Sequence, residues 1–536
     1  MPKQFEINEG AGRNRFLGLI LLLAVILAYQ PVWHAGFIWD DDDHVTANPC
    51  IIGPLGLKEI WTTSAARYYP LVLTTFWVEH ALWGLAPLPY HLVNVLLHGI
   101  CAILLWQVLR SLRIRGAWLG AALWALHPVQ VESVAWISEM KNTASSLFFL
   151  LSILFFVRWL RAGGIDHRKG GGWDYPLALL FAALAMASKS STVILPVVLC
   201  LCAWWVEGRF RWRRVARVGP IFFMSAIAAT LAMWTVDLQG VNTDTQWAQS
   251  WPQRLIGAGD AFWFYLGKLV WPHPLIFIYP RWGIDAGRWC SYLPLVAMAV
   301  VTFVLWRKRE LWSGPWFLAG AYFLTALLPV LGLVQHYFLR YSLVADHLQY
   351  LASMGPLALA GAGLARFSDS VIPDKPRLRS SLCVLLLLLL GTLSWQRAWV
   401  YVSEETLWTD TLARNPKCWM AYDNLGSLLF QKGQIDTAIV QFQKALDINP
   451  NDAPALNNLG LAFFQKGRID EAVSQYKMAL QNDPNFDQAY NNLGNALVKK
   501  GQVDEAIAQY RKAVEINPTN VSARTNLGWI LFQRGD

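Results

Sequence analysis

The chain has 536 residues, of which 55% are hydrophobic and only 15% charged, and it contains 29 tryptophans. This composition excludes an ordinary soluble protein and predicts a membrane protein with many spans. The net charge of +9 does not indicate nucleic-acid binding, because the basic residues form short clusters between apolar stretches. The long apolar runs stop near residue 400, so we predict a membrane domain over 1–400 and a second domain over 401–536.

Apolar stretches in the first domain predict about eleven membrane helices in an all-α fold. The first one follows Arg13 and Arg15 and has no small-residue cleavage site, so we expect it to be retained. Segment 239–291 contains a further apolar stretch at 261–280, whose prolines and aromatic residues predict a re-entrant or interfacial element. The predicted spans are 16–34, 91–109, 117–135, 143–160, 175–188, 191–206, 219–237, 292–306, 314–334, 348–365 and 381–396.

The basic clusters predict the orientation of these spans. With the eleven spans above, every cluster lies on one side of the membrane, which should be the cytoplasmic side together with the N-terminus. The external loop 35–90, the loops near 127–142, 188–191 and 335–347, segment 239–291 and everything after 396 then face the opposite compartment. The clusters lie at 13–15, 110–115, 158–169, 209–217, 307–309 and 366–379.

Four consecutive aspartates occupy positions 40–43, directly after the first predicted span. A solvated charge run that marks the end of the span explains them as well as a functional role does. The seven cysteines show no metal-ligand spacing, and a bridge between Cys50 and Cys290 is conceivable but has no support in the sequence. In the second span, His91, Asn94 and His98 share one helix face, for which we expect hydrogen bonds between helices.

The second domain repeats with a period of 34 residues. Glycine recurs at 426, 460, 494 and 528, and proline recurs at 416, 450, 484 and 518. A small residue is needed where two helices approach closely, and proline stops the second helix of each pair. The period predicts a tetratricopeptide-repeat α-solenoid with three full repeats and a partial fourth.

One asparagine per repeat precedes the Leu-Gly pair of the first helix. The repeat consensus explains an asparagine at this position as well as a binding role does. The alternative is a ladder that binds an acceptor peptide, because a carboxamide can donate to and accept from a peptide backbone. Such a ladder resembles the one in the repeats of O-GlcNAc transferase. Its members would be Asn424, Asn458, Asn492 and Asn526.

A set of motifs in a fixed order resembles the transmembrane and tetratricopeptide-repeat-containing O-mannosyltransferases and their bacterial relatives. The resemblance covers nearly the whole chain and includes the repeats. It implies a GT-C glycosyltransferase in a bacterial inner membrane that uses a polyprenyl-phosphate-linked sugar. The motifs are FIWDD at 37–41, Asn48-Pro49, YYPL at 68–71, YHLVNVLLH at 90–98, HPVQVESVAWISEMKN at 127–142 and DHLQYLASMG at 346–355.

The family places an acidic residue in its first external loop, and its motif matches Asp40 and Asp41. A carboxylate that accepts the proton of a Ser or Thr hydroxyl speeds such a transfer roughly 100- to 10,000-fold. Either aspartate could be this base, because neighbouring carboxylates resist joint ionisation. If the site holds a divalent metal such as Mg²⁺ or Mn²⁺, Asp40, Asp41 and Glu132 are its predicted ligands.

Cationic side chains on the external face should bind the donor phosphate. The candidates are Lys141, Lys189, Arg281 and Arg340; the remaining predicted site-lining residues are His127, Glu132, Asn142, Asp346 and Tyr350. Animal members of the family tend to carry Arg and Asp where this chain has Lys141 and Asn142, and Ser-Lys-Glu is more usual at 188–190. These departures bear on the donor sugar more than on the type of reaction.

The leading interpretation is an enzyme that glycosylates Ser or Thr of an exported protein captured by the repeats. Transfer to a lipid or a polysaccharide is the alternative enzyme. A non-catalytic membrane scaffold that presents the repeats does not require acids and cations on one membrane face. A transporter is disfavoured, because charged residues are not spaced through the middle of several spans.

Overall fold

The computed structural model describes residues 3–63, 69–163, 172–209, 211–238, 249–311, 313–334, 337–371 and 373–534. These ranges contain α-helices and short 3-10 or π turns, and they contain no β-strand. The chain divides into two compact units, Met1–Ser403 and Glu404–Asp536. The all-α prediction is confirmed, and the division lies close to the predicted boundary at residue 400.

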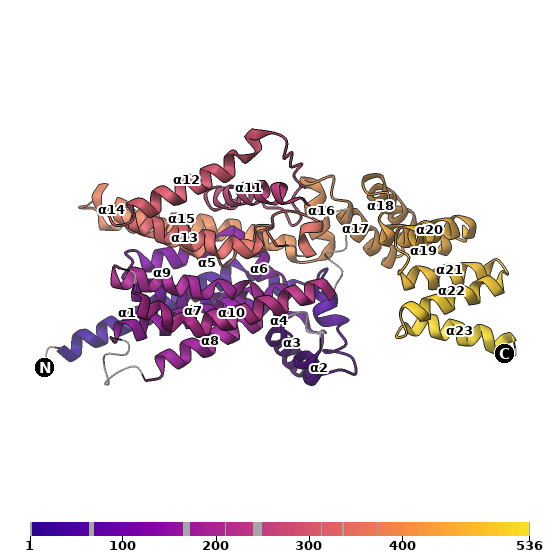
Figure 1. The fold of residues 1–536 in the computed structure, drawn as a ribbon, viewed down its shortest axis with the longest axis horizontal. Helices are drawn as coiled ribbons and strands as arrows, with labels where there is room; N and C mark the ends of the chain where they lie inside the picture. Colours follow the sequence, from indigo (N-terminus) through magenta and orange to yellow (C-terminus); the bar gives the residue numbers. More distant parts are fainter. Residues whose placement is uncertain are drawn as a thin grey trace. The chain divides into compact units, whose positions relative to one another are not determined.

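The first unit is a bundle of apolar helices (Figure 1). Six helical stretches among the described residues are long and apolar enough to cross a membrane: Pro87–Ser111, Ile137–Arg161, Ser190–Glu207, Val215–Thr235, Trp289–Lys308 and Pro376–Tyr401. The helices are α1 (Lys3–Ala28), α2 (Leu57–Thr62), α3 (Pro70–Trp83), α4 (Pro87–Ser111), α5 (Ala117–Ala125), α6 (Val131–Ala135), α7 (Met140–Arg161), α8 (Asp174–Ser188), α9 (Leu195–Glu207), α10 (Trp212–Leu238), α11 (Trp251–Val270), α12 (Leu293–Lys308), α13 (Gly314–Leu327), α14 (Met354–Val371) and α15 (Pro376–Ala398).

The predicted span 117–135 is wrong as a continuous helix. α5 ends at Ala125, and a 3-10 turn over Pro128–Gln130 separates it from the five-residue α6. Pro128 has no backbone N–H to continue the helical ladder, so the chain must leave the helix there. The irregular stretch is buried in protein, which is the condition for non-helical backbone at membrane depth. It carries Glu132 and Glu139.

Three other predicted segments differ in detail. The predicted external loop 35–90 contains two α-helices, α2 and α3, and in the predicted span 348–365 the α-helix begins only at Met354. In segment 239–291, α11 ends at Val270, just before Pro272, and no helix occurs over 271–288. The predicted break in 261–280 therefore falls at its prolines. Residues 239–248, Tyr68 of the YYPL motif and basic residues 168 and 169 lie outside the described residues.

Small residues allow the helices of the first unit to pack closely. α7 packs against α8 through Ala178, Ala182 and Ala185, which are fully buried, and Ser152 Oγ donates to Ala178 O at 2.8 Å. α5 and α14 cross where Gly120 meets Gly361, and a Cβ on Gly361 would collide with the Gly120 backbone. Such close crossings are typical of helices that associate within a membrane.

The second unit consists of antiparallel helix pairs stacked in sequence order (Figure 1). Its periodic glycines meet two different structural requirements. A Cβ on Gly426, Gly460 or Gly494 would lie 2.7, 2.7 or 2.5 Å from the ring of Phe442, Tyr476 or Tyr510. The glycines at 433, 467 and 501 have φ near +76° in the turns between paired helices. The helices are α16 (Glu404–Arg414), α17 (Trp419–Gln431), α18 (Ile435–Ile448), α19 (Ala453–Gln465), α20 (Ile469–Asn482), α21 (Asp487–Lys499), α22 (Val503–Ile516) and α23 (Val521–Arg534).

Helix α3 buries a carboxyl group that predicts a pH-dependent weakness of the first unit. Glu79 is 3% exposed, and no described residue bonds to either of its oxygens. Burial raises its pKa to about 8 from 4.5. The folded protein should therefore lose stability as the pH rises from about 4.5 through about 8, because the unfolded chain ionises first.

We expect Glu79→Gln to raise the free energy of unfolding at pH 8 by about 1 to 3 kcal/mol, because it removes the buried ionisable group. The measurement is the melting temperature of the purified protein at pH 5, 6.5 and 8. Glu310→Gln, at an exposed carboxylate, is the matched control and should change the curve little. An unchanged pH dependence in Glu79→Gln would refute this account.

Candidate active site

The two predicted aspartates lie in different environments. Asp41 is fully buried, and its Oδ2 accepts a hydrogen bond from Ile38 N at 2.9 Å. Its Oδ1 accepts from both N and Oγ of Ser138, at 2.8 and 2.5 Å. Burial raises the pKa of Asp41 to about 7, although these hydrogen bonds lower it. Asp41 thus connects the loop after α1 to the turn before α7.

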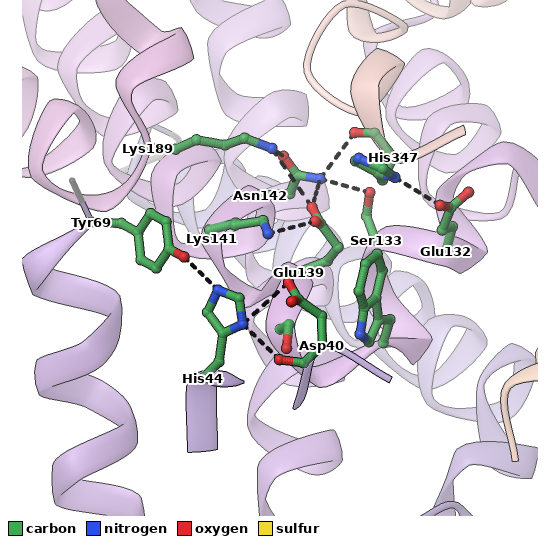
Figure 2. Close-up of polar contacts among 12 residues, drawn as sticks. Asp40, His44, Tyr69, Glu132, Ser133, Glu139, Lys141, Asn142, Lys189 and His347 are labelled. Carbon is green, nitrogen blue, oxygen red and sulfur yellow. Dashed lines mark hydrogen bonds and ion pairs between the residues drawn. The ribbon is translucent and has the colours of Figure 1, made fainter. Parts of the chain in front are cut away.

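Asp40, by contrast, has a side chain that is 26% exposed. Its Oδ2 lies 3.2 Å from His44 Nδ1, and its carbonyl oxygen lies 2.7 Å from the same nitrogen. The other ring nitrogen of His44 bonds to the hydroxyl of Tyr69 (Figure 2). His44 and Tyr69 were not predicted from the sequence, although Asp40 and His44 stand four residues apart and Tyr69 belongs to the YYPL motif.

A buried carboxylate at the start of α7 gathers the two predicted lysines. The side chain of Glu139 is 1% exposed, and its oxygens lie 2.9 Å from Lys141 Nζ and 3.6 Å from Lys189 Nζ (Figure 2). Asn142 Nδ2 also donates to Glu139, at 2.6 Å, and Lys189 Nζ donates to Asn142 Oδ1 at 2.6 Å. We call Glu139, Lys141, Asn142 and Lys189 the lysine cluster.

The lysine cluster has one carboxylate for two ammonium groups, and Asp40 and Glu132 add nearby negative charges that act on Lys141 and on Lys189, respectively. Burial lowers the pKa of Lys189 to about 8 from 10.5, and Glu139 opposes part of this change. An arriving negative charge would favour the protonated form of Lys189. Glu139 was not predicted, although it lies inside the motif at 127–142.

A second buried pair adjoins the lysine cluster. Glu132 Oε1 lies 2.7 Å from His347 Nδ1, and the His347 carbonyl accepts from Asn142 Nδ2 at 2.9 Å. Asn142 Nδ2 is also 3.0 Å from Ser133 Oγ, so Asn142 connects α6, α7 and the 346–349 turn. The predicted residues Glu132, Asn142, Lys141 and Lys189 therefore meet in one place (Figure 2).

Aromatic rings form one wall beside these groups. Trp39 stacks on Trp136 with centroids 5.4 Å apart, and Phe277 meets both rings edge-on at 5.3 Å. Lys141 Nζ lies 5.7 Å from the centroid of Trp136. Several buried polar atoms here have no hydrogen-bond partner within the described ranges: Trp136 Nε1, Glu132 Oε2 and the side-chain amide of Gln349. Buried polar atoms are nearly always paired, so these atoms lack partners that burial normally requires.

The three other predicted lining residues, His127, Tyr350 and Asp346, have structural partners. His127 Nε2 lies 3.1 Å from Leu269 O, so it holds the end of α11. Tyr350 is fully buried, and its hydroxyl lies 2.7 Å from His98 Nδ1. Asp346 accepts a hydrogen bond from Tyr279 at 3.0 Å, and burial raises its pKa to about 6, although Arg397 lowers it. Arg397 is itself 7% exposed, and the sequence did not single it out.

The two predicted arginines lie against each other in the loops after α11 and α13. Arg281 donates from Nη1 to the carbonyl of Arg340 at 2.9 Å, and the Arg340 guanidinium lies 5.8 Å from the ring centroid of Tyr341. Tyr341 is also in edge contact with Trp39, at 6.0 Å. This contact links the arginine pair to the aromatic wall. Their predicted role as phosphate ligands remains a prediction.

The predicted metal ligands are not gathered around one point. Both carboxylate oxygens of Asp41 accept hydrogen bonds, one from Ile38 N and the other from Ser138, and Glu132 is bonded to His347. Among the residues that the structure describes, no group of three His, Cys, Asp or Glu side chains could hold a metal ion. Asp40, Asp41 and Glu132 therefore do not fit a shared metal.

Cys50 is buried, Cys290 is exposed, and both are free thiols, so the conceivable bridge is not formed.

The polar face of α4 does join helices, as its spacing predicted. Asn94 Nδ2 donates to the carbonyls of Ser133 and Val134 at 3.2 and 2.9 Å, and His98 Nε2 lies 2.9 Å from Ala125 O. These bonds satisfy backbone groups that the break after α5 leaves without helical partners. The prediction for Asn94 and His98 is confirmed, and it explains how the irregular stretch before α7 is held.

In the repeats, the periodic asparagines connect neighbouring helices. The Nδ2 atoms of Asn458, Asn492 and Asn526 donate to side-chain oxygens 35 residues earlier, at 3.1, 2.9 and 2.8 Å. Asn424 instead donates to Met420 O at 2.8 Å. No described residue donates to the Oδ1 atoms of these four asparagines. Each amide thus uses its donor within the solenoid and leaves an acceptor for a ligand.

Comparison with known proteins finds the same two parts. The family described as "TPR repeat" matches residues 426–467, 460–501 and 494–535. Human protein O-mannosyl-transferase TMTC4 is 24% identical over 490 residues, covering 78% of this chain and 65% of the human protein. Protein O-mannosyl-transferase F38B6.6 of Caenorhabditis elegans is 22% identical over 480 residues, covering 84% of this chain and 64% of the relative.

A shorter match is closer in sequence. Protein O-mannosyl-transferase Tmtc1 of Drosophila melanogaster is 31% identical over 194 residues, which is 34% of this chain and 22% of the fly protein. The chain spans less than two thirds of the length of each of these relatives. The similarity to proteins of this name over most of the chain, and the tetratricopeptide repeats, agree with the resemblance found in the motifs.

Proposed function

We propose that this chain, which is a homologue of the TMTC protein O-mannosyl-transferases, is a GT-C membrane glycosyltransferase that modifies exported proteins. The donor would be a sugar, mannose by analogy with the names of the relatives, linked to polyprenyl phosphate. The acceptor would be a Ser or Thr hydroxyl. The observation that carries the proposal is the lysine cluster, with two ammonium groups for one carboxylate, beside the accessible carboxylate of Asp40 (Figure 2).

The leaving group explains the lysine cluster. As the bond between the anomeric carbon and the phosphate oxygen breaks, its electron pair passes to the phosphate, whose negative charge grows. Positioned cations stabilise such a charge more in the transition state than in the ground state. Lys141 and Lys189 supply them, and Glu139 and Asn142 hold both ammonium groups in place before the donor arrives.

The acceptor explains Asp40. The hydroxyl oxygen of Ser or Thr attacks the anomeric carbon, and its proton passes to the Asp40 carboxylate. His44, supported by Tyr69, fixes the position of Asp40, and Asp41 fastens the loop that carries them. Asp41 is thus a positioning residue, whereas Asp40 touches the substrate. The unpaired polar atoms of Trp136, Glu132 and Gln349 would bind sugar hydroxyls.

The site would open on the extracytoplasmic side, in a bacterial inner membrane. Six membrane-length apolar helices support a multi-pass protein, and the positions of the basic clusters support this orientation. The tetratricopeptide unit would face the same compartment and capture the acceptor. Its periodic asparagines offer side-chain oxygens to the backbone N–H groups of an extended peptide.

A transfer assay tests this function directly. The full-length protein in lipid vesicles is incubated with polyprenyl-phosphate mannose and Ser/Thr-containing segments of exported proteins, and products are identified by intact mass. One added hexose on a peptide supports the proposal. Transfer to lipid alone, with every peptide unmodified, would replace it with the alternative of a lipid or polysaccharide acceptor. No transfer to any acceptor would leave a scaffold as the better interpretation.

We expect the double variant Asn458→Ala, Asn492→Ala to raise KM for the acceptor protein about 10-fold with little change in kcat, because lost hydrogen bonds weaken ground and transition states equally. Gln443→Ala with Lys477→Ala, at exposed positions of α18 and α20, is the matched control. The melting temperature of the repeat unit shows whether the lost contacts between helices contribute. An unchanged KM would remove the asparagines from acceptor binding.

A further inference from the structure

The opposite end of the first unit contains a cavity unrelated to the lysine cluster. It has a volume of about 770 Å³ and is lined by residues of α1, α4 and α7, of which α4 packs against both others. A cavity of this size is large enough for a small-molecule ligand. Its polar lining consists of Arg15, Arg110, Arg158, Asn14, Gln107 and Ser111. We call it the arginine cavity.

The arginine cavity is strongly positive. Each of its three helices contributes one arginine, and no acidic side chain belongs to its lining. None of Arg15, Arg110 and Arg158 forms an ion pair with a carboxylate in the part of the chain that the structure describes. The guanidinium of Arg110 lies 5.4 Å from the ring centroid of Trp106. Three gathered cations repel one another unless an anion neutralises them, so the arrangement favours an anionic ligand.

The other part of the lining of the arginine cavity is apolar. Leu19, Leu22, Ile103 and Leu154 form it, and the ring of Trp106 lies against Gly18. A free phosphate ion would gain nothing from contact with these apolar side chains. A phospholipid, in contrast, would place its headgroup among the arginines and the start of its acyl chains along the leucines. Basic pockets between membrane helices on the cytoplasmic side are known to suit anionic lipid headgroups.

The position along the helices agrees with this ligand. Arg110 and Arg158 lie in the last turns of α4 and α7, and Arg15 follows the first turns of α1. The positive-inside rule assigns these ends to the cytoplasmic leaflet. We propose that the arginine cavity binds the phosphodiester headgroup of an anionic phospholipid from the cytoplasmic leaflet, on the face of the membrane opposite the glycosyl-transfer site.

The test uses the full-length protein, delipidated in detergent, and counts bound lipid by native mass spectrometry during titration with phosphatidylglycerol or phosphatidylcholine. We expect one phosphatidylglycerol to bind in preference to phosphatidylcholine. In the triple variant Arg15→Gln, Arg110→Gln, Arg158→Gln its affinity should fall about 100-fold, because each basic residue near an anionic headgroup contributes about 1 kcal/mol. The charge-conserving variant Arg15→Lys, Arg110→Lys, Arg158→Lys should keep most of the affinity.

The matched control removes the same charge elsewhere on the same side. Arg13→Gln, Arg209→Gln, Arg377→Gln changes three exposed arginines that do not line the cavity. An equal loss of affinity in this control and in the cavity variant would overturn the proposal, since it would reduce the effect to net charge. Equal binding of both lipids, or competition by millimolar inorganic phosphate as strong as that by lipid, would overturn it as well. Variants are compared only where gel filtration and melting temperature match the unaltered protein.

Discussion

Asp40→Asn is expected to lower kcat for sugar transfer by at least about 100-fold while the protein remains folded, because an amide cannot accept the acceptor's proton. KM for both substrates should change much less, since the Asp40 carboxylate acts mainly in the transition state. The measurement is the transfer rate on a peptide acceptor in vesicles, with the melting temperature as a check on folding.

The aspartate run provides matched controls for this experiment. Asp43→Asn removes the same charge from an exposed position three residues away, and we expect a change in kcat of less than about twofold. Asp41→Asn should instead lower the melting temperature, because an amide nitrogen cannot accept the bonds from Ser138 and Ile38. If Asp40→Asn retains full activity, the base is another group, and the assignment of Asp40 fails.

The second large effect is expected at the lysine cluster. Lys189→Ala should lower kcat by about 100-fold, comparable to the loss of one donor that stabilises a developing negative charge. Lys141→Ala should act in the same direction. Lys58→Ala removes an exposed lysine of α2 on the same predicted membrane face, and it should leave the rate nearly unchanged. Equal rates in Lys58→Ala and Lys189→Ala would exclude Lys189 from the transfer step.

The pKa of Lys189 predicts a pH dependence of kcat/KM that a purely structural role of this lysine would not produce. Because burial lowers it to about 8, the ammonium group should lose its proton as the pH rises through about 8 in the enzyme without donor. The kcat/KM for the donor should fall over the same range. Lys189→Arg should retain activity and lose this alkaline decline, because a guanidinium stays charged. A decline of the same shape in both proteins would assign it to another group.

Local pattern in the sequence determined the features that repeat along the chain. The 34-residue period fixes the solenoid, because glycine is needed beside the Phe442, Tyr476 and Tyr510 rings and again in the turns between paired helices. Apolar run length fixes most membrane helices, since a span must satisfy its own backbone. The motifs also brought Lys141, Asn142 and Lys189 forward as site residues before their contacts were seen.

Only the tertiary structure determined which role each site residue has. Asp40 and Asp41 are adjacent and chemically identical in the sequence, and they differ because Ser138, 97 residues away, accounts for one oxygen of Asp41. Glu139 became the centre of the lysine cluster only when α7 brought it beside the turn that carries Lys189. Burial and pairing depend on which distant segments meet, and this information is absent from any single stretch of sequence.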